Sequence, residues 1–346
     1  MMTIRSPRWG ILPLVLIAVF GAASLNACST EAVQQKAMEI TAIDSTTPVF
    51  LGCKTVSSKE INFEFSLPVA VSSLDFDPPL EVGSVAGGTT VRVLLAEAPP
   101  EGTRITANLL VEDEVGNTLD ILIPFRARND RLPKLVITEI RTKHTKPKAD
   151  FVEFKTQSAG NLGALRLFTA GFSMEEPLLE FPPVEVAEGE YILVHLRTWE
   201  TDTADETGTD LGASGGAEAF PDVRDFWIPE SVERLRETDA VFFLDQDGLI
   251  VDGLLLNADD GKFAALAAAA ELFGRQGKWN PPEGSAETGY VPGDEDAVDS
   301  KGTTTTRSIC RWEEQPNTNS AADWYITANS GASPGKPNNT TVYEPK

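Results

Sequence analysis

The sequence predicts an all-β protein with two β-sandwich domains in tandem, the second with long insertions and one or two short helices. Two observations lead to this class. Apolar and polar residues alternate in short runs such as Ile61 to Phe65, which is the pattern of a half-buried strand. Turn-forming segments such as Asp77-Pro78-Pro79 separate these runs at close spacing, as in sandwiches.

Residues 47–130 make up the first predicted sandwich. Alternation continues through Val91 to Leu95 and Ile121 to Phe125, and no stretch predicts a helix. Ile61 to Val69 (INFEFSLPV) and Val111 to Leu119 (VEDEVGNTL) resemble a strand and a D-x-x-G-N turn of bacterial Ig-like domains of envelope proteins. The resemblance implies an Ig-like sandwich.

A polar junction, 126–133, ends in proline and is a suitable domain boundary. Beyond it, a second strand-rich region is predicted over residues 131–340, with residues 341–346 as a tail. Its predicted strands are 134–140, 150–154, 162–168, 188–196, 240–244 and 249–251.

The segments I-x-E-I from Ile137, D-x-V-E-F from Asp150 and the closing S-P-G-K-P-N from Ser333 resemble the lamin-tail domain, an Ig-like sandwich also found in exported bacterial proteins. This resemblance implies that Glu139 and Glu153 lie close together in the sandwich framework. Residues 200–226 and 257–306 exceed what a compact domain of this family needs, and they are expected to be insertions.

Two helical segments are expected inside the second region. The alanine-rich run Lys262 to Phe273 predicts a helix that ends at Gly274. A short helical turn is expected at Pro229 to Glu237. Residues 281–306 are acidic and rich in Gly, Pro, Ser and Thr, which is typical of a long loop.

The N-terminus carries Arg5 and Arg8, followed by an apolar run of about 15 residues, which is shorter than the roughly 20 that span a bilayer. The run ends in Leu25-Asn26-Ala27-Cys28, which resembles the lipobox of bacterial lipoproteins. The resemblance implies a signal peptide over 1–27, lipid on Cys28 and a tether over 28–46. An ordinary signal peptide cut near Ala27 is the alternative. By the sorting rule of that family, Ser29 rather than Asp after the Cys implies the outer membrane or cell surface of the envelope.

Composition limits the partners. A net charge of −23 at pH 7 repels phosphate backbones, so we expect no nucleic-acid binding. Cys53 and Cys310 form either a disulfide or two separately buried thiols.

No constellation of residues predicts catalysis, and the chain is not expected to be an enzyme. His144 and His195 are not at metal-ligand spacing, so a zinc site is not expected. No Gly-x-Ser-x-Gly elbow occurs. Glu139 and Glu153 are interpreted as structural, since a glycosidase pair would need a cleft between its acids.

The metal candidates are weak. Asp245, Asp247 and the later Asp252 resemble the start of a calcium loop, but an Asp-Gly hairpin turn explains the same residues. The acidic cluster at 294–299 is expected to be a solvated loop. No cofactor is expected beyond the lipid on Cys28 and weakly bound calcium.

Large aromatic side chains lie in or beside the insertions and are candidate binding residues: Trp227, Trp279, Tyr290 and Trp312, with Phe226. The leading hypothesis is a non-enzymatic envelope lipoprotein that acts in binding, adhesion or scaffolding, with a protein or glycan partner. The alternatives are a hydrolase or hydrolase accessory built on the insertions, and a structural spacer. The identity of the partner, the membrane face and the oligomeric state stay open.

Overall fold

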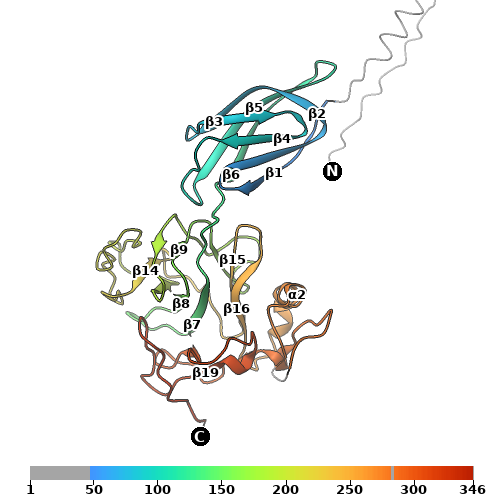
Figure 1. The fold of residues 1–346 in the computed structure, drawn as a ribbon. Helices are drawn as coiled ribbons and strands as arrows, with labels where there is room; N and C mark the ends of the chain where they lie inside the picture. The colour runs from blue at the N-terminus through green and yellow to red at the C-terminus, as the bar shows by residue number, and fades with distance from the viewer. Residues whose placement is uncertain (1–46, 282–283, 346) are drawn as a thin grey trace, which may run out of the picture. The chain divides into compact units, whose positions relative to one another are not determined.

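Strands dominate the computed structural model, which describes residues 47–281 and 284–345 (Figure 1). The all-β prediction of sandwich type is therefore confirmed. The predicted signal peptide, Cys28 and the tether at 28–46 lie outside the described residues. Among the residues that are described, no helix has the length and apolar character needed to cross a membrane.

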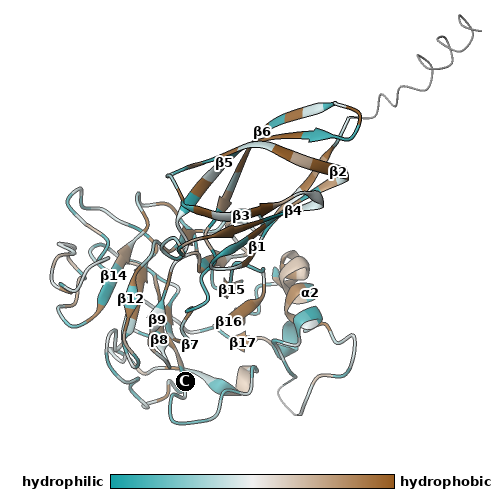
Figure 2. Ribbon diagram, turned by 45° about the horizontal axis from the view of Figure 1, so that its top comes forward, coloured by the Kyte–Doolittle hydropathy of each residue, from teal (hydrophilic) through white to brown (hydrophobic). Residues whose placement is uncertain are grey.

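The first region forms one six-stranded sheet in the order β3-β4-β2-β5-β6, with β1 paired to β2. The strands are β1 (Phe50–Ser57), β2 (Glu60–Asp77), β3 (Val82–Ala86), β4 (Gly88–Leu95), β5 (Arg104–Asp113) and β6 (Thr118–Arg126). Polar and apolar residues alternate along β4 and β5 (Figure 2), so each of these strands buries one face.

The long strand β2 belongs to two layers. Its first part pairs with β1 and β4, and its second part, from Val69 onward, pairs with β5. Register shifts between Glu64 and Val69 and between Val71 and Ser73 mark where the strand bends. The apolar core of this region lies between the two layers and includes Phe63, which is fully buried.

The second region contains two larger sheets and a small one. Their orders are β14-β13-β8-β7-β18-β19, β11-β10-β15-β16-β17 and β12-β9. The strands are β7 (Leu135–Arg141), β8 (Phe151–Thr156), β9 (Gly160–Asn161), β10 (Arg166–Thr169), β11 (Leu179–Glu180), β12 (Glu185–Val186), β13 (Tyr191–His195), β14 (Arg224–Trp227), β15 (Asp239–Leu244), β16 (Ile250–Asn257), β17 (Val298–Asp299), β18 (Ile309–Arg311) and β19 (Trp324–Ile326).

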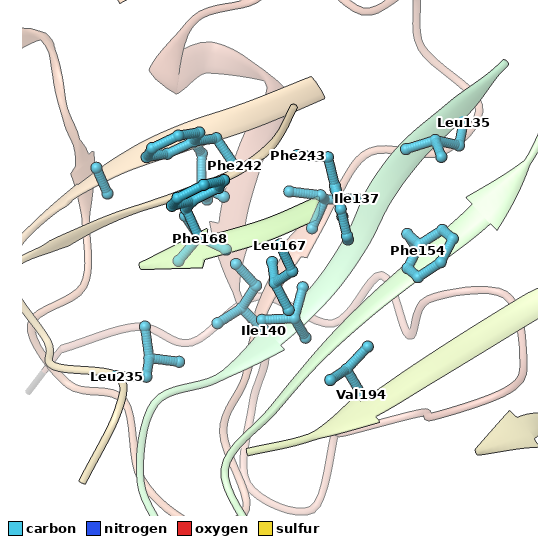
Figure 3. Packing of buried hydrophobic residues seen from close by; sticks show 14 of the residues in the cluster. Leu135, Ile137, Ile140, Phe154, Leu167, Phe168, Val194, Leu235, Phe242 and Phe243 are labelled. Carbon is cyan, nitrogen blue, oxygen red and sulfur yellow. The ribbon is translucent and has the colours of Figure 1, made fainter. Parts of the chain in front are cut away.

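Aromatic side chains join the two larger sheets across one apolar core (Figure 3). Phe154 of β8 meets Phe243 of β15 edge to face at 4.8 Å between ring centroids. Within one of these sheets, Phe168 of β10 stacks on its register partner Phe242 of β15 at 5.3 Å. The second region is thus a sandwich with its own core, separate from that around Phe63.

The predicted helix is present but ends later than expected. A 3-10 turn, η1 (Phe263–Leu266), leads into α2 (Ala267–Gln276), which ends at Gly277 with φ of 62°. Gly274 lies inside the helix, and a Cβ there would approach the Tyr290 carbonyl oxygen to 2.2 Å. Glycine at this position allows the helix to pack closely against the segment around Tyr290; it does not end the helix. Two further 3-10 turns are η2 (Asp294–Asp296) and η3 (Ala321–Asp323).

The helical turn expected at 229–237 is wrong, since this segment has no helical structure. The buried Arg234 guanidinium donates to the carbonyl oxygens of Pro229 at 2.7 Å and Leu196 at 3.1 Å. The Arg234 side chain therefore donates to the Pro229 carbonyl oxygen, which a helix would use as a main-chain acceptor. The strand β14 begins inside the predicted insertion at 200–226 and was not predicted from the sequence. It pairs in parallel with β13.

Contacts join the two regions within one compact unit, Thr47–Lys346. Arg128 pairs with Asp247 at 2.9 Å, and Arg131 pairs with Glu101 at 2.6 Å. Gly102 packs so closely on Gly163 that a Cβ on Gly102 would come within 2.8 Å of the Gly163 Cα. The domain boundary proposed at 126–133 stays a prediction.

Candidate functional site: a buried acid pair under the closing segment

Glu139 on β7 lies directly opposite Glu153 on β8, and we call these two residues the acid pair. A register shift between Ile137 and Glu139 makes Thr138 a bulge residue, which leaves the two glutamates facing each other on one side of the sheet. Both are fully buried, at 0% exposure.

The acid pair lies on the sheet face that points away from the main core. Cys310 of β18 is the register partner of Glu139, and Leu193 of β13 is that of Glu153. The adjacent row, with Ile140 opposite Val152, belongs to the main core. Because side chains alternate between faces, the acids need another cover.

Residues 333–339, here called the closing segment, provide that cover. The Ser333 main-chain N–H and hydroxyl donate to Glu139 Oε2 at 3.0 and 3.2 Å. The Gly335 N–H donates to Glu153 Oε2 at 2.5 Å, and the Thr138 hydroxyl donates to Glu153 Oε1 at 2.6 Å. The chain itself therefore occupies the carboxyl oxygens.

Burial raises the pKa of Glu139 and raises that of Glu153 further, because Glu139 also faces Glu153. Two carboxylates that share a dry site cannot both ionise at low cost. The pair therefore holds a proton more readily in the folded protein than either carboxyl does in the unfolded chain. That proton belongs to the pair rather than to one residue.

Asn338 anchors the other end of the closing segment. Its main-chain N–H donates to Glu313 Oε1 at 2.8 Å, and its side-chain amide donates to the carbonyl oxygens of Thr138 and Arg311 at 2.8 and 3.0 Å. Glu313 also accepts from the Tyr191 hydroxyl at 2.8 Å and from Lys155 Nζ at 3.1 Å. In the closing S-P-G-K-P-N sequence, Ser333, Gly335 and Asn338 thus donate the hydrogen bonds that hold this segment on the sheet.

A buried ion pair joins the two large sheets. Arg311 Nη2 lies 2.8 Å from Asp252 Oδ2, and Arg311 Nε donates to the Ile137 carbonyl oxygen at 2.7 Å. The guanidinium also lies over the Trp324 ring at 4.3 Å. Burial raises the pKa of Asp252, and the positive charge of Arg311 opposes that rise.

A third buried polar group holds the 200–226 segment on the sheet. His195 Nε2 lies 2.8 Å from Asp225 Oδ1, and its ring stacks on Trp227 at 3.7 Å. The Asp225 N–H in turn donates to Glu206 Oε2 at 2.9 Å. Both His195 and Asp225 are fully buried, so this dyad faces protein on all sides.

Residues 133–326, which contain most of these groups, match the family model TP_1001_2nd, described as a protein second domain. This chain belongs to that family. We call the matched residues the family domain.

A protein of Treponema pallidum (strain Nichols), described as uncharacterized, is 26% identical over 198 residues, which cover 54% of this chain and 50% of the relative. The N-terminal part of the bacterial S-layer protein SbsC aligns at 17% identity and a TM-score of 0.24, over 49% of this chain and 45% of that one. A TM-score this low supports no argument about fold or function. The chain spans about half the length of each of these proteins.

The proposed calcium ligands do not come together in the family domain. Asp245 accepts from the N–H groups of Asp247 at 2.9 Å and Leu249 at 2.8 Å, as in the hairpin-turn alternative. Asp247 pairs with Arg128, and Asp252 is buried and pairs with Arg311. Within residues 47–281 and 284–345, no group of three or more His, Cys, Asp or Glu side chains could hold a metal.

The candidate binding aromatics do not share an exposed patch. Trp279 is fully buried against Phe273, and its indole N–H donates to the Asp296 carbonyl oxygen at 2.9 Å. Trp227 is also buried. Trp312 stacks on Tyr325 at 3.9 Å, while Tyr290 is half-buried. Their proximity to insertions in sequence reflects anchoring of those insertions onto the core.

Cys53 is half-buried and Cys310 is buried, and both are free thiols, as the second of the two alternatives held. Burial raises the pKa of Cys53 to about 12. Sequence reasoning missed the Arg311 ion pair with Asp252. The signal was available, since Asp252 stands inside the apolar run Leu249 to Leu256, where a carboxylate needs a buried partner.

Proposed function

We propose that this chain is a non-catalytic protein of the cell envelope, held on a membrane by lipid on Cys28, and that its two β regions serve as a rigid binding module. The Leu25 to Cys28 sequence supports the anchor. Two acyl chains hold a protein stably on a bilayer, at about 0.8 kcal/mol per buried methylene. The second region is proposed to be lamin-tail-like, with the closing segment as its most specific feature.

One observation carries the non-catalytic part of the proposal. The fully buried acid pair, the group best suited in this domain to acid–base chemistry, is bound by Ser333, Gly335 and Thr138 of the same chain. Catalysis would require the closing segment to leave and a substrate to take over these contacts. Such a group stabilises a platform, on which loops carry recognition.

Membrane fractionation tests the anchor. Cells expressing the native chain are labelled with a palmitate analogue and compared with cells expressing Cys28→Ser. We expect label and membrane association for the native chain, and loss of both for Cys28→Ser. Cys53→Ser is the matched control and should behave as native, because this thiol is half-buried and unpaired. Retention of label by Cys28→Ser would refute the anchor.

A substrate screen tests the non-catalytic part. The full chain is assayed against phosphoester, glycan, peptide and nucleic-acid substrates, beside Glu139→Gln and Glu153→Gln. We expect no turnover above buffer in any of the three proteins. Turnover that disappears in a folded Glu153→Gln variant would instead support the hydrolase alternative.

A further inference from the structure

The first region has an opening on one side of its sandwich that the family domain and the lipid anchor do not explain. It is a depression of about 470 Å³ between the second half of β2, from Val69 to Leu74, and Val82 and Val85 of β3. We call it the strand slot. Val71, Leu74 and Val82 are half-buried there and pack against the core, so its floor is apolar.

Among the residues that the structure describes, both walls of the strand slot are strand edges without a neighbour. From Ala70 to Asp77, β2 pairs with β5 alone, and β3 pairs with β4 alone. In an antiparallel sheet, every second residue of such a strand turns its N–H and C=O away from its one partner. The slot is therefore bordered by two sets of outward main-chain groups, which is the arrangement that accepts an added strand.

The strand slot is closed at one end and open at the other. Val69 pairs with Gly88, and a Cβ on Gly87 would approach the Val69 carbonyl oxygen to 2.5 Å. Glycine at 87 therefore lets the two walls meet at this point. Val85, two residues before this point, is 40% exposed.

Four carboxylates adjoin the residues that line the strand slot, and we call them its acidic rim. Asp75 and Asp77 continue along β2, Glu81 precedes β3, and Glu112 lies opposite Ala70 on β5. None of these four carboxylates makes an ion pair in the part of the chain that the structure describes. The nearby Arg92, register partner of Ala86, is already paired with Glu60 at 2.8 Å. The rim thus favours a positively charged partner.

We propose that the strand slot binds an extended segment of a partner protein in which apolar and basic residues alternate. The segment adds as a strand between β2 and β3. Its apolar side chains face Val71, Leu74 and Val82, and its basic side chains lie near Asp75 and Glu112. Main-chain hydrogen bonds supply affinity, while the apolar floor and acidic rim select the sequence.

The probe is a labelled nine-residue peptide of alternating valine and lysine, titrated into the full chain by fluorescence anisotropy. The same peptide with its central valine replaced by proline has the same charge and controls for charge alone, since proline removes a strand hydrogen bond. We expect the alternating peptide to bind at least about tenfold more tightly than the proline peptide, with slowed amide hydrogen exchange at 69–74 and 82–86.

Two variants locate the binding. Ser73→Lys places a like charge in the strand slot and should weaken binding about tenfold or more. Leu122→Lys adds the same charge on β6, where the side chain is 71% exposed, and should leave binding unchanged. Equal weakening by both variants, or no change in hydrogen exchange, would overturn the proposal. So would self-association of the chain that Ser73→Lys abolishes, because a second copy would then occupy the slot.

Discussion

The two regions of this protein bury different kinds of side chain. In the first region, the buried set around Phe63 is apolar, and its ion pairs, such as Arg92 with Glu60, lie at the surface. In the family domain, an equally apolar core coexists with buried Glu139, Glu153 and Asp252, among other charged groups. The first region is stabilised by apolar packing between alternating strands. The second region also depends on polar contacts between segments that are distant in the sequence.

This difference separates two sources of specificity. An alternating strand places its own side chains, and its neighbours need only be apolar and of suitable volume. A buried carboxyl needs particular donors, and each missing donor costs stability. The family domain should therefore be the region where single polar substitutions cause large effects.

The largest effect is expected for Asp252→Ala. This change removes the carboxylate that lies 2.8 Å from Arg311 and leaves the buried guanidinium with the longer contact to Asp323 at 3.6 Å, so the cost is up to about 3–5 kcal/mol of unfolding free energy. Urea unfolding of the full chain measures it. The matched control is Glu60→Ala, which removes the surface partner of Arg92 and should cost about 0–1 kcal/mol. Equal losses in the two variants would remove the contrast between the regions.

Leu109→Ala should cost about 2–5 kcal/mol, because Leu109 is fully buried in the first core. The same urea experiment, followed by tryptophan fluorescence, reports the other region, since no tryptophan lies between residues 47 and 130. We expect an unchanged fluorescence midpoint if the two regions unfold separately. A lower midpoint would mean that they unfold together, against the domain boundary proposed at 126–133.

Glu153→Gln should flatten the pH dependence of stability. Because the pKa of Glu153 is raised on folding, the native protein binds more protons than the unfolded chain above the ordinary value of 4.5. Stability from this group is present below that pH and is lost as pH rises toward the folded value, at about 1.4 kcal/mol per pKa unit.

Unfolding free energies at pH 5 and pH 8 measure this loss. The native chain should lose stability between them, Glu153→Gln should lose less, and Glu64→Gln, at an exposed site on β2, should follow the native chain. An identical slope in all three proteins would show that the acid pair is not the source.

The smallest effect is expected at the contact between the regions. Arg128→Ala removes a half-exposed pair with Asp247 and should cost about 0–1 kcal/mol. A double-mutant cycle with Asp247→Ala measures the coupling free energy. A coupling well above 1 kcal/mol would mean that this junction contributes as much as a buried contact.

The sequence predicted those parts of the fold whose signal is local. Alternation located the start of β2, β4 and β6, because each buries one face. It missed β14, since all four of its residues are buried and no alternation exists there. The end of α2 was misplaced because the packing of Gly274 against Tyr290 depends on a distant segment.

The candidate site was predictable only in part. The resemblance of two strands to lamin-tail strands predicted that Glu139 and Glu153 lie close together. The strand register places them directly opposite each other. The donors that cover them were not predictable, because Gly335 contributes a main-chain N–H that no side chain signals. The positions of Trp227 and Trp279 likewise depend on how the insertions return to the core.

The reach of the closing segment has a consequence for biosynthesis. Ser333 joins Glu139 across 194 positions of the chain, and Gly335 joins Glu153 across 182. While the chain is being synthesised, the acid pair lacks these main-chain donors until residues 333 to 335 have been added. The fold around the acid pair therefore cannot be completed progressively, because a chain that stops before this point lacks the donors that cover the two carboxyl groups.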